Sequence, residues 1–142
     1  MLSPDICQWL EANQHSGYAS HLSANRGAIE AELSSLGIDL NSEVAYLYLN
    51  YGSGPVRGWY ELNEVEQIRE ATSYAHSELG VPENYLALTG IEGQGITLLD
   101  KNTWAVFDVE FGQFEKLASG ALAPVASSFG EFLHWCKRNE NA

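Results

Sequence analysis

Basic residues are scarce in this sequence. Seven lysines and arginines stand against nineteen aspartates and glutamates, which gives a formal net charge of −12 at pH 7. Proteins that bind phosphate backbones or anionic membrane surfaces rely on clusters of lysine and arginine. We therefore expect neither nucleic acid nor a membrane surface as a direct partner. An acidic surplus either keeps a small protein soluble or binds a basic protein partner.

Cysteines and long apolar runs are also scarce. The two cysteines, Cys7 and Cys136, lie near opposite ends of the chain. A disulfide between them would require an oxidising compartment, and two reduced thiols are the expected state in the cytosol. No apolar run approaches the roughly 20 residues of a membrane span, and no secretory signal pattern follows Met1. We expect a cytoplasmic protein.

The length and the apolar content suit one domain over residues 1–142. A chain of 142 residues that is 45% hydrophobic is long enough to bury roughly two thirds of its unfolded surface without a metal or disulfide. Residues 1–26 are expected to form a helix, at residues 4–12, and a polar connection. Cys7, Cys136 and the four histidines form no set of ligands at zinc-site spacing, so we expect no metal and no cofactor.

Acidic residues concentrate in residues 61–115. This segment holds eleven of the nineteen carboxylates and, of the basic residues, only Arg69 and Lys101. It reads as a helix followed by an antiparallel hairpin. Asn63 and Glu66 are spaced like the two members of a capping box and predict the start of that helix.

The hairpin is predicted from two apolar-rich runs, at residues 96–99 and 104–109. The turn between them contains Asn102, which tolerates the left-handed conformation that a short hairpin loop requires. In the second run the apolar residues alternate with Asp108 and Glu110, as in a strand with one buried and one partly wet face.

These elements predict an α+β fold, in which helices flank a mostly antiparallel sheet of about four to six strands. The strands placed by the pattern are residues 58–62, 85–89, 96–99 and 104–109. The predicted core consists of Leu33, Leu47, Leu49, Ile68, Leu86, Leu98, Phe107, Phe129 and Leu133.

Residues 44–49 are ambiguous. Their alternation of apolar and aromatic residues favours a strand. Asn41 or Ser42 followed by Glu43 instead favours the start of a helix. Periodicity alone favours the strand.

Three groups of residues, taken in order, resemble the SUKH superfamily. They are Leu36-Gly37-Ile38-Asp39-Leu40 with Tyr46-Leu47 and Asn50-Tyr51-Gly52, then Trp59-Tyr60-Glu61-Leu62 with Val65-Glu66-Gln67-Ile68, and last Ser127-Ser128-Phe129-Gly130-Glu131-Phe132-Leu133. The resemblance covers about residues 29–137 and implies a helix at residues 44–49. It also implies a short strand at 59–62 and a closing helix after Ser127.

The resemblance implies a non-catalytic protein-binding domain. Bacterial SUKH proteins resemble immunity proteins that neutralise cognate toxins, many of them nucleases, and the yeast relatives resemble regulators of signalling and cell-wall synthesis. A basic toxin domain is therefore the expected partner, and a regulatory or scaffold role is an alternative. The expected contacts are Glu61, Glu64, Asp108 and Glu110, with Trp59, Tyr60 and Trp104 as aromatic neighbours.

Two further classes of function stay open. Asp100, Asp108 and Glu110 would suit a carboxylate-based hydrolase or a divalent ion if they converged. No serine or cysteine nucleophile has a histidine and an acid at a spacing that places them nearby. A small-molecule sensor would bind its ligand on a platform of tryptophan side chains. The alternative is that these tryptophans are buried in the core. The platform would consist of Trp59, Trp104 and Trp135.

Overall fold

The computed structural model describes residues 1–56, 61–91 and 95–140, in which it has seven helices and one antiparallel sheet of three strands. Their bounds are α1 (Pro4–Asn13), α2 (Tyr18–Ala24), α3 (Arg26–Ser35), α4 (Glu43–Asn50), α5 (Val65–Glu78), β1 (Tyr85–Ala87), β2 (Gly95–Asp100), β3 (Val106–Glu110), α6 (Phe114–Ser119) and α7 (Phe129–Arg138). The α+β class is confirmed. Within the described ranges, however, the sheet is smaller than the four to six strands expected.

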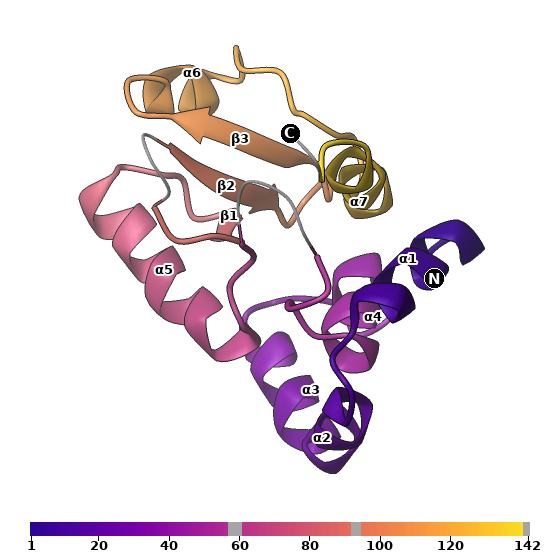
Figure 1. Cartoon of the computed structure of the whole chain (residues 1–142). Coiled ribbons are helices and arrows are strands. Elements are labelled where there is room, and N and C mark those ends of the chain that lie inside the picture. The colour runs from indigo at the N-terminus through magenta and orange to yellow at the C-terminus, as the bar shows by residue number, and fades with distance from the viewer. Residues whose placement is uncertain (57–60, 92–94, 141–142) are drawn as a thin grey trace.

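The sheet is covered on both faces. β2 lies between β1 and β3 and is antiparallel to both (Figure 1). Because consecutive strand residues point to opposite faces, Leu98 joins Phe107 in a cluster with side chains of α5 and α6. Leu99 joins Val106 in a second cluster, which contains side chains of α1 to α4 and α7. Figure 1 accordingly shows α5 and α7 on opposite sides of the sheet.

The predicted core is confirmed in full. The nine predicted residues, all of them buried, are Leu33, Leu47, Leu49, Ile68, Leu86, Leu98, Phe107, Phe129 and Leu133. Cys7 and Cys136 are both thiols, as the sequence predicted. A closing helix is also confirmed, because Ser128 caps α7 by accepting the Glu131 backbone N–H at 3.2 Å.

Residues 44–49 form a helix, α4, as the family resemblance implied. Ser42 caps it by accepting the Ala45 backbone N–H at 3.2 Å. The strand-like pattern arises because α4 is buried on several sides, so apolar residues are not confined to one stripe. Even its tyrosine Tyr48 is fully buried, and the hydroxyl donates to the Asn63 carbonyl at 2.7 Å.

Two expectations about the helices are wrong. The polar connection within residues 1–26 contains a further helix, α2, in which Leu22 is the one buried residue. Glu64, and not Asn63, is the N-cap of α5, and it forms a capping box with Gln67. Asn63 instead donates its backbone N–H to the Leu88 carbonyl at 2.6 Å, which ties the start of α5 to the chain after β1.

The strand predictions need correction at their ends. Of the expected strand at residues 58–62, positions 58–60 lie outside the described residues, and Glu61 and Leu62 are not in a strand. The hairpin is confirmed, but its left-handed residue is Trp104, with φ 66°, and not Asn102. Trp104 takes this conformation because it is the last residue of a loop closed by its N–H and the Asp100 carbonyl at 2.7 Å.

The central strand gives a direct test of the packing. Leu98 is 0% exposed on β2, so Leu98→Ala should lower the free energy of unfolding by about 2–5 kcal/mol. The matched control is Leu40→Ala, at a position that is 36% exposed, which should change it by less than about 0.5 kcal/mol. Urea unfolding followed by circular dichroism measures both, and equal losses would contradict the placement of β2.

Candidate functional site

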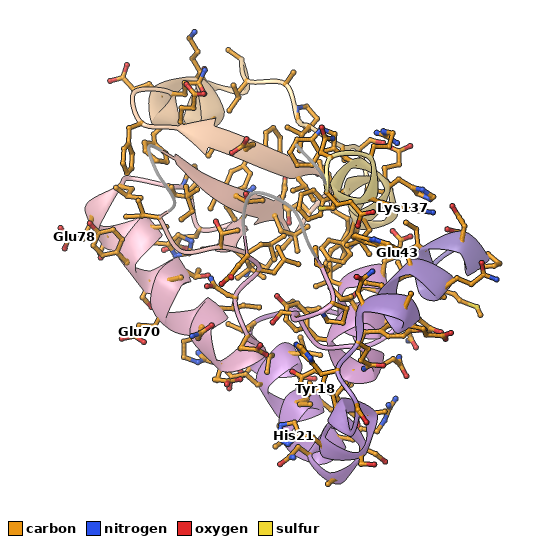
Figure 2. The ribbon with its side chains drawn as sticks, in the orientation of Figure 1. Tyr18, His21, Glu43, Glu70, Glu78 and Lys137 are labelled. Carbon is orange, nitrogen blue, oxygen red and sulfur yellow. The ribbon has the colours of Figure 1, made fainter. Side chains whose placement is uncertain are left out.

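The exposed face of α5 carries much of the acidic segment. Glu66, Glu70 and Glu78 are exposed, and Figure 2 shows Glu70 and Glu78 pointing away from the rest of the chain. The ion pairs that join two described residues are Arg26–Glu30, Arg69–Glu32 and His134–Asp5. Arg69, the one lysine or arginine of α5, thus neutralises a carboxylate of α3. Glu66 and Glu70 are four residues apart on the helix and repel each other.

A cavity of about 430 Å³ lies between α2, α3 and the start of α5. Tyr18 and His21 of α2 line it and stack on each other, with ring centroids 5.7 Å apart and planes inclined by 17°. Figure 2 shows both side chains at the α2 end of the molecule. Gly52 is required here, because a Cβ at its φ of +68° would lie 2.6 Å from the Tyr18 ring.

Glu64, one of the predicted contacts, lies at this cavity. Its carboxylate caps α5, where negative charge is stabilised by the helix dipole. Its Oε2 also accepts a hydrogen bond from the Tyr18 hydroxyl at 3.4 Å. Burial, followed by the charge of Glu64, raises the pKa of Tyr18. The sequence missed Tyr18 and His21, since the only local signal was their spacing of three residues in a polar segment.

Asp108 and Glu110 lie together on β3. Asp108 is half-buried opposite Thr97, and Glu110 is exposed opposite Gly95. Burial, and then the charge of Glu110, raises the pKa of Asp108. A carboxylate kept in such surroundings destabilises the fold when it is ionised, which makes it a candidate for function.

Asp100 does not join these two carboxylates. It pairs with Tyr85 at the end of β2 that is farthest from the Gly95–Glu110 pair, five residues or roughly 17 Å along the strand. Its Oδ1 accepts hydrogen bonds from the Asn84 side chain at 3.0 Å and the Asn102 backbone at 2.8 Å. The convergent set of three acids that a hydrolase would use is therefore not formed.

Of the three aromatic contacts predicted from the sequence, Trp104 alone lies within the described residues. Trp104 is partly buried against the cluster of α1 to α4 and α7, at the Asp100 end of the hairpin. Trp59 and Tyr60 lie outside the described residues. Glu61 is exposed near the start of α5. The structure thus brings Asp108 and Glu110 together, whereas it places Glu64 at the α2 cavity and Trp104 at the other end of the sheet.

A serine with a neighbouring histidine and acid is present, contrary to the sequence-based expectation. Ser3 Oγ lies 3.2 Å from His134 Nε2, and His134 Nδ1 lies 3.7 Å from Asp5 Oδ2. No local pattern indicates this cluster, because Ser3 and His134 are 131 positions apart. The Ser3 hydroxyl, however, donates to Asp5 Oδ1 at 2.7 Å. Its proton is therefore directed to the acid and away from the base that would have to remove it.

The neighbouring backbone donor is occupied as well. At the start of α7, Glu43 Oε1 accepts the Gly130 N–H at 3.1 Å. Figure 2 shows Glu43 between α4 and α7. A carboxylate at this point disfavours the oxyanion of an acyl-transfer reaction. We therefore interpret the Ser3, Asp5 and His134 cluster as a polar contact between α1 and α7.

Across the described part of the chain, no group of three or more histidine, cysteine, aspartate and glutamate side chains could hold a metal ion. In that part, too, no helix is long and apolar enough to cross a bilayer.

Asp108 gives a prediction about pH. Its pKa is raised above 3.8 in the folded state, so its ionised form opposes folding at neutral pH, and this penalty disappears as the pH falls through the raised pKa to below 3.8. Asp108→Asn should therefore raise the melting temperature at pH 7 by roughly 1–3 °C, a small value because the group is half-exposed. The difference should vanish at pH 3, and Glu83→Gln should change neither value. A lower melting temperature for Asp108→Asn at pH 7 would contradict this assignment.

Asp5 gives the opposite prediction. The hydrogen bond from Ser3, and then the charges of His134 and Lys137, lower the pKa of Asp5 below 3.8. The ionised Asp5 carboxylate therefore stabilises the folded state. This stabilisation is fully present above pH 3.8, and it is lost as the pH falls through the lowered pKa of Asp5. Ser3→Ala should shift the pKa of Asp5 upward, toward its ordinary value, in an NMR titration of the carboxyl carbon. An unchanged pKa in this variant would show that the contact is not formed in solution.

Comparison with known proteins identified no relative of this chain. No protein-family model, no curated protein and no solved structure matches the chain. The resemblance to the SUKH superfamily stays a prediction from its motifs.

Proposed function

We propose that the chain is a non-catalytic protein-binding domain whose acidic surface binds a basic protein. The observation that carries this proposal is the exposed face of α5. There Glu66, Glu70 and Glu78 have no ion pair with another described residue, and Arg69 is engaged by Glu32 of α3. A basic partner would supply the missing cations and relieve the repulsion between neighbouring carboxylates.

The same face has an apolar centre. Tyr74 is 47% exposed on α5 and Ile91 is 43% exposed after β1. Both line a hollow of about 390 Å³, together with Glu70 and Ile96. Binding energy concentrates in aromatic anchors that lose their water, and charged rims steer the encounter. We therefore move the centre of the proposed interface from the strands to α5.

The partner that fits best is a nuclease toxin domain, and the chain would be its immunity protein. A nuclease must present lysine and arginine in order to grip a polyanion. A rigid acidic surface competes for these groups and raises the association rate from the neutral 10⁵–10⁶ M⁻¹s⁻¹ to roughly 10⁸ M⁻¹s⁻¹ at low salt. The motifs that resemble the SUKH superfamily and the α+β fold support this class, and such a protein acts in the cytoplasm without a cofactor.

The proposed interface also includes the four acidic contacts predicted from the sequence, Glu61, Glu64, Asp108 and Glu110. Glu61 and Glu64 lie at the start of α5, next to the acidic face. Asp108 and Glu110 form a second acidic pair on β3. The raised pKa of Asp108 means that its ionised form destabilises the fold.

A panel of catalytically inactivated bacterial nuclease toxin domains tests the proposal. We expect a 1:1 complex with at least one member, and inhibition of the corresponding active nuclease. The double variant Glu70→Lys/Glu78→Lys should slow association at least about tenfold at low salt and flatten its salt dependence, because long-range attraction sets the encounter rate.

The control is Glu83→Lys/Glu115→Lys, which changes the net charge equally at exposed positions outside α5. Its effect on association should be several-fold smaller, and both double variants should keep the melting temperature. Equal slowing by both would show that only net charge matters, and an unchanged rate in both would place the interface elsewhere.

A further inference from the structure

We infer that the cavity between α2, α3 and the start of α5 is an arginine pocket, which receives one arginine side chain of the basic partner protein. This inference rests on the proposed function and adds the specific contact at the α2 end of α5. The cavity holds about 430 Å³, within the roughly 300–1,000 Å³ that is typical of ligand pockets. It is therefore large enough for a whole side chain and not only for water.

Two aromatic side chains, Tyr18 and His21, line the pocket. Their rings are stacked with an interplanar angle of 17°, so each ring offers a ligand only the flat face that points away from the other ring. Tyr18 is held in place from behind by the backbone of Gly52 and at its hydroxyl by Glu64. A guanidinium group stacks on such a surface through cation–π attraction and planar contact.

The rest of the lining is acidic. Three carboxylates, from Glu32, Glu64 and Glu66, line the pocket, and none of its described lining residues is a lysine or arginine. Arg69 neutralises Glu32 from outside the lining, so Glu64 and Glu66 are the carboxylates without an ion pair to a described residue. Glu66 is exposed at its rim. The apolar floor comes from Leu22 and Ile29, and it excludes water around a bound side chain, which strengthens each charge-assisted hydrogen bond.

These features select arginine among possible occupants. An anion would be repelled by Glu64 and Glu66, which have no ion pair with a described residue. A neutral apolar group would desolvate these two carboxylates without supplying a cation to either of them. Lysine is a compact point charge with three donors, whereas arginine combines a plane that stacks on Tyr18 with a fork of donors that meets carboxylates in pairs.

Short capped peptides test the pocket without the natural partner. We expect acetyl-Gly-Arg-Gly-amide to shift the NMR signals of the Tyr18 and His21 rings with saturation, at a dissociation constant on the order of 1 mM. The peptide with citrulline, which has the same shape without the charge, should bind at least about tenfold more weakly. The lysine peptide should bind several-fold more weakly than the arginine peptide.

Variants assign the binding to the pocket. Glu66→Gln should weaken binding of the arginine peptide several-fold. The matched control is Glu70→Gln, one turn farther along α5 and outside the pocket, which should leave binding of the peptide unchanged. Tyr18→Leu should abolish the saturable shifts of His21, whereas Tyr18→Phe keeps the ring and should retain them. Melting curves verify that each variant is folded.

The outcomes separate this inference from the proposed function. Equal binding of the arginine and citrulline peptides, equal effects of Glu66→Gln and Glu70→Gln, or shifts that do not saturate would overturn the pocket. Free arginine carries an α-ammonium and an α-carboxylate that an arginine within a protein chain lacks, so tighter binding of free arginine than of the peptide would also overturn an origin in a protein partner. If the arginine peptide does not bind while the Glu70→Lys/Glu78→Lys variant still slows association with the toxin, the inferred pocket is wrong and the proposed function stands. The reverse pattern would leave a pocket and remove that function.

Discussion

Burial of β2 on both faces is the constraint on which the rest of the structure depends. Leu98 and Leu99 are adjacent, point to opposite faces of the sheet and are both 0% exposed. A sheet of three strands has no second sheet to cover it, so helices must pack on each side. α5 and α6 cover one face, and α4 and α7 belong to the cluster on the other. One side of α5 is thereby fixed against the sheet, and its opposite side is left in solvent as a rigid acidic surface.

The parts of the fold that the sequence predicted correctly are those encoded by local patterns. The hairpin followed from two apolar runs around a turn. α7 followed from the motif at residues 127–133 that resembles the closing element of the SUKH superfamily. Two helices were missed, α2 and α6, and each buries a single residue, Leu22 and Leu117 respectively. They pack against α4 and β3, so tertiary contacts stabilise them and no local apolar stripe marks them.

The candidate site was less predictable than the fold, because it depends on residues that are distant in sequence. The acidic segment was visible as composition, but its division between α5 and β3 required the register of the hairpin. Tyr18 and Glu64 meet across 46 positions. Gly52 reaches the same place from the end of α4. Since no short-range pattern links these positions, the cavity could not be inferred from spacing, and even the cap of α5 was misplaced by one residue.

The distribution of charge supports the proposed binding role of the acidic surplus over a role in solubility alone. Solubility needs net charge, and it is served best when like charges are spread apart. In this chain Glu66 and Glu70 are a helical turn apart, and the arginine between them, Arg69, is drawn away to Glu32. Asp108 keeps a carboxylate where burial opposes its ionisation. Each arrangement lowers stability slightly, and each would become favourable in the presence of a cationic partner, because a ligand that binds only the folded state stabilises it by mass action. A surface that is unfavourable alone and favourable in a complex is the physical pattern of a binding site.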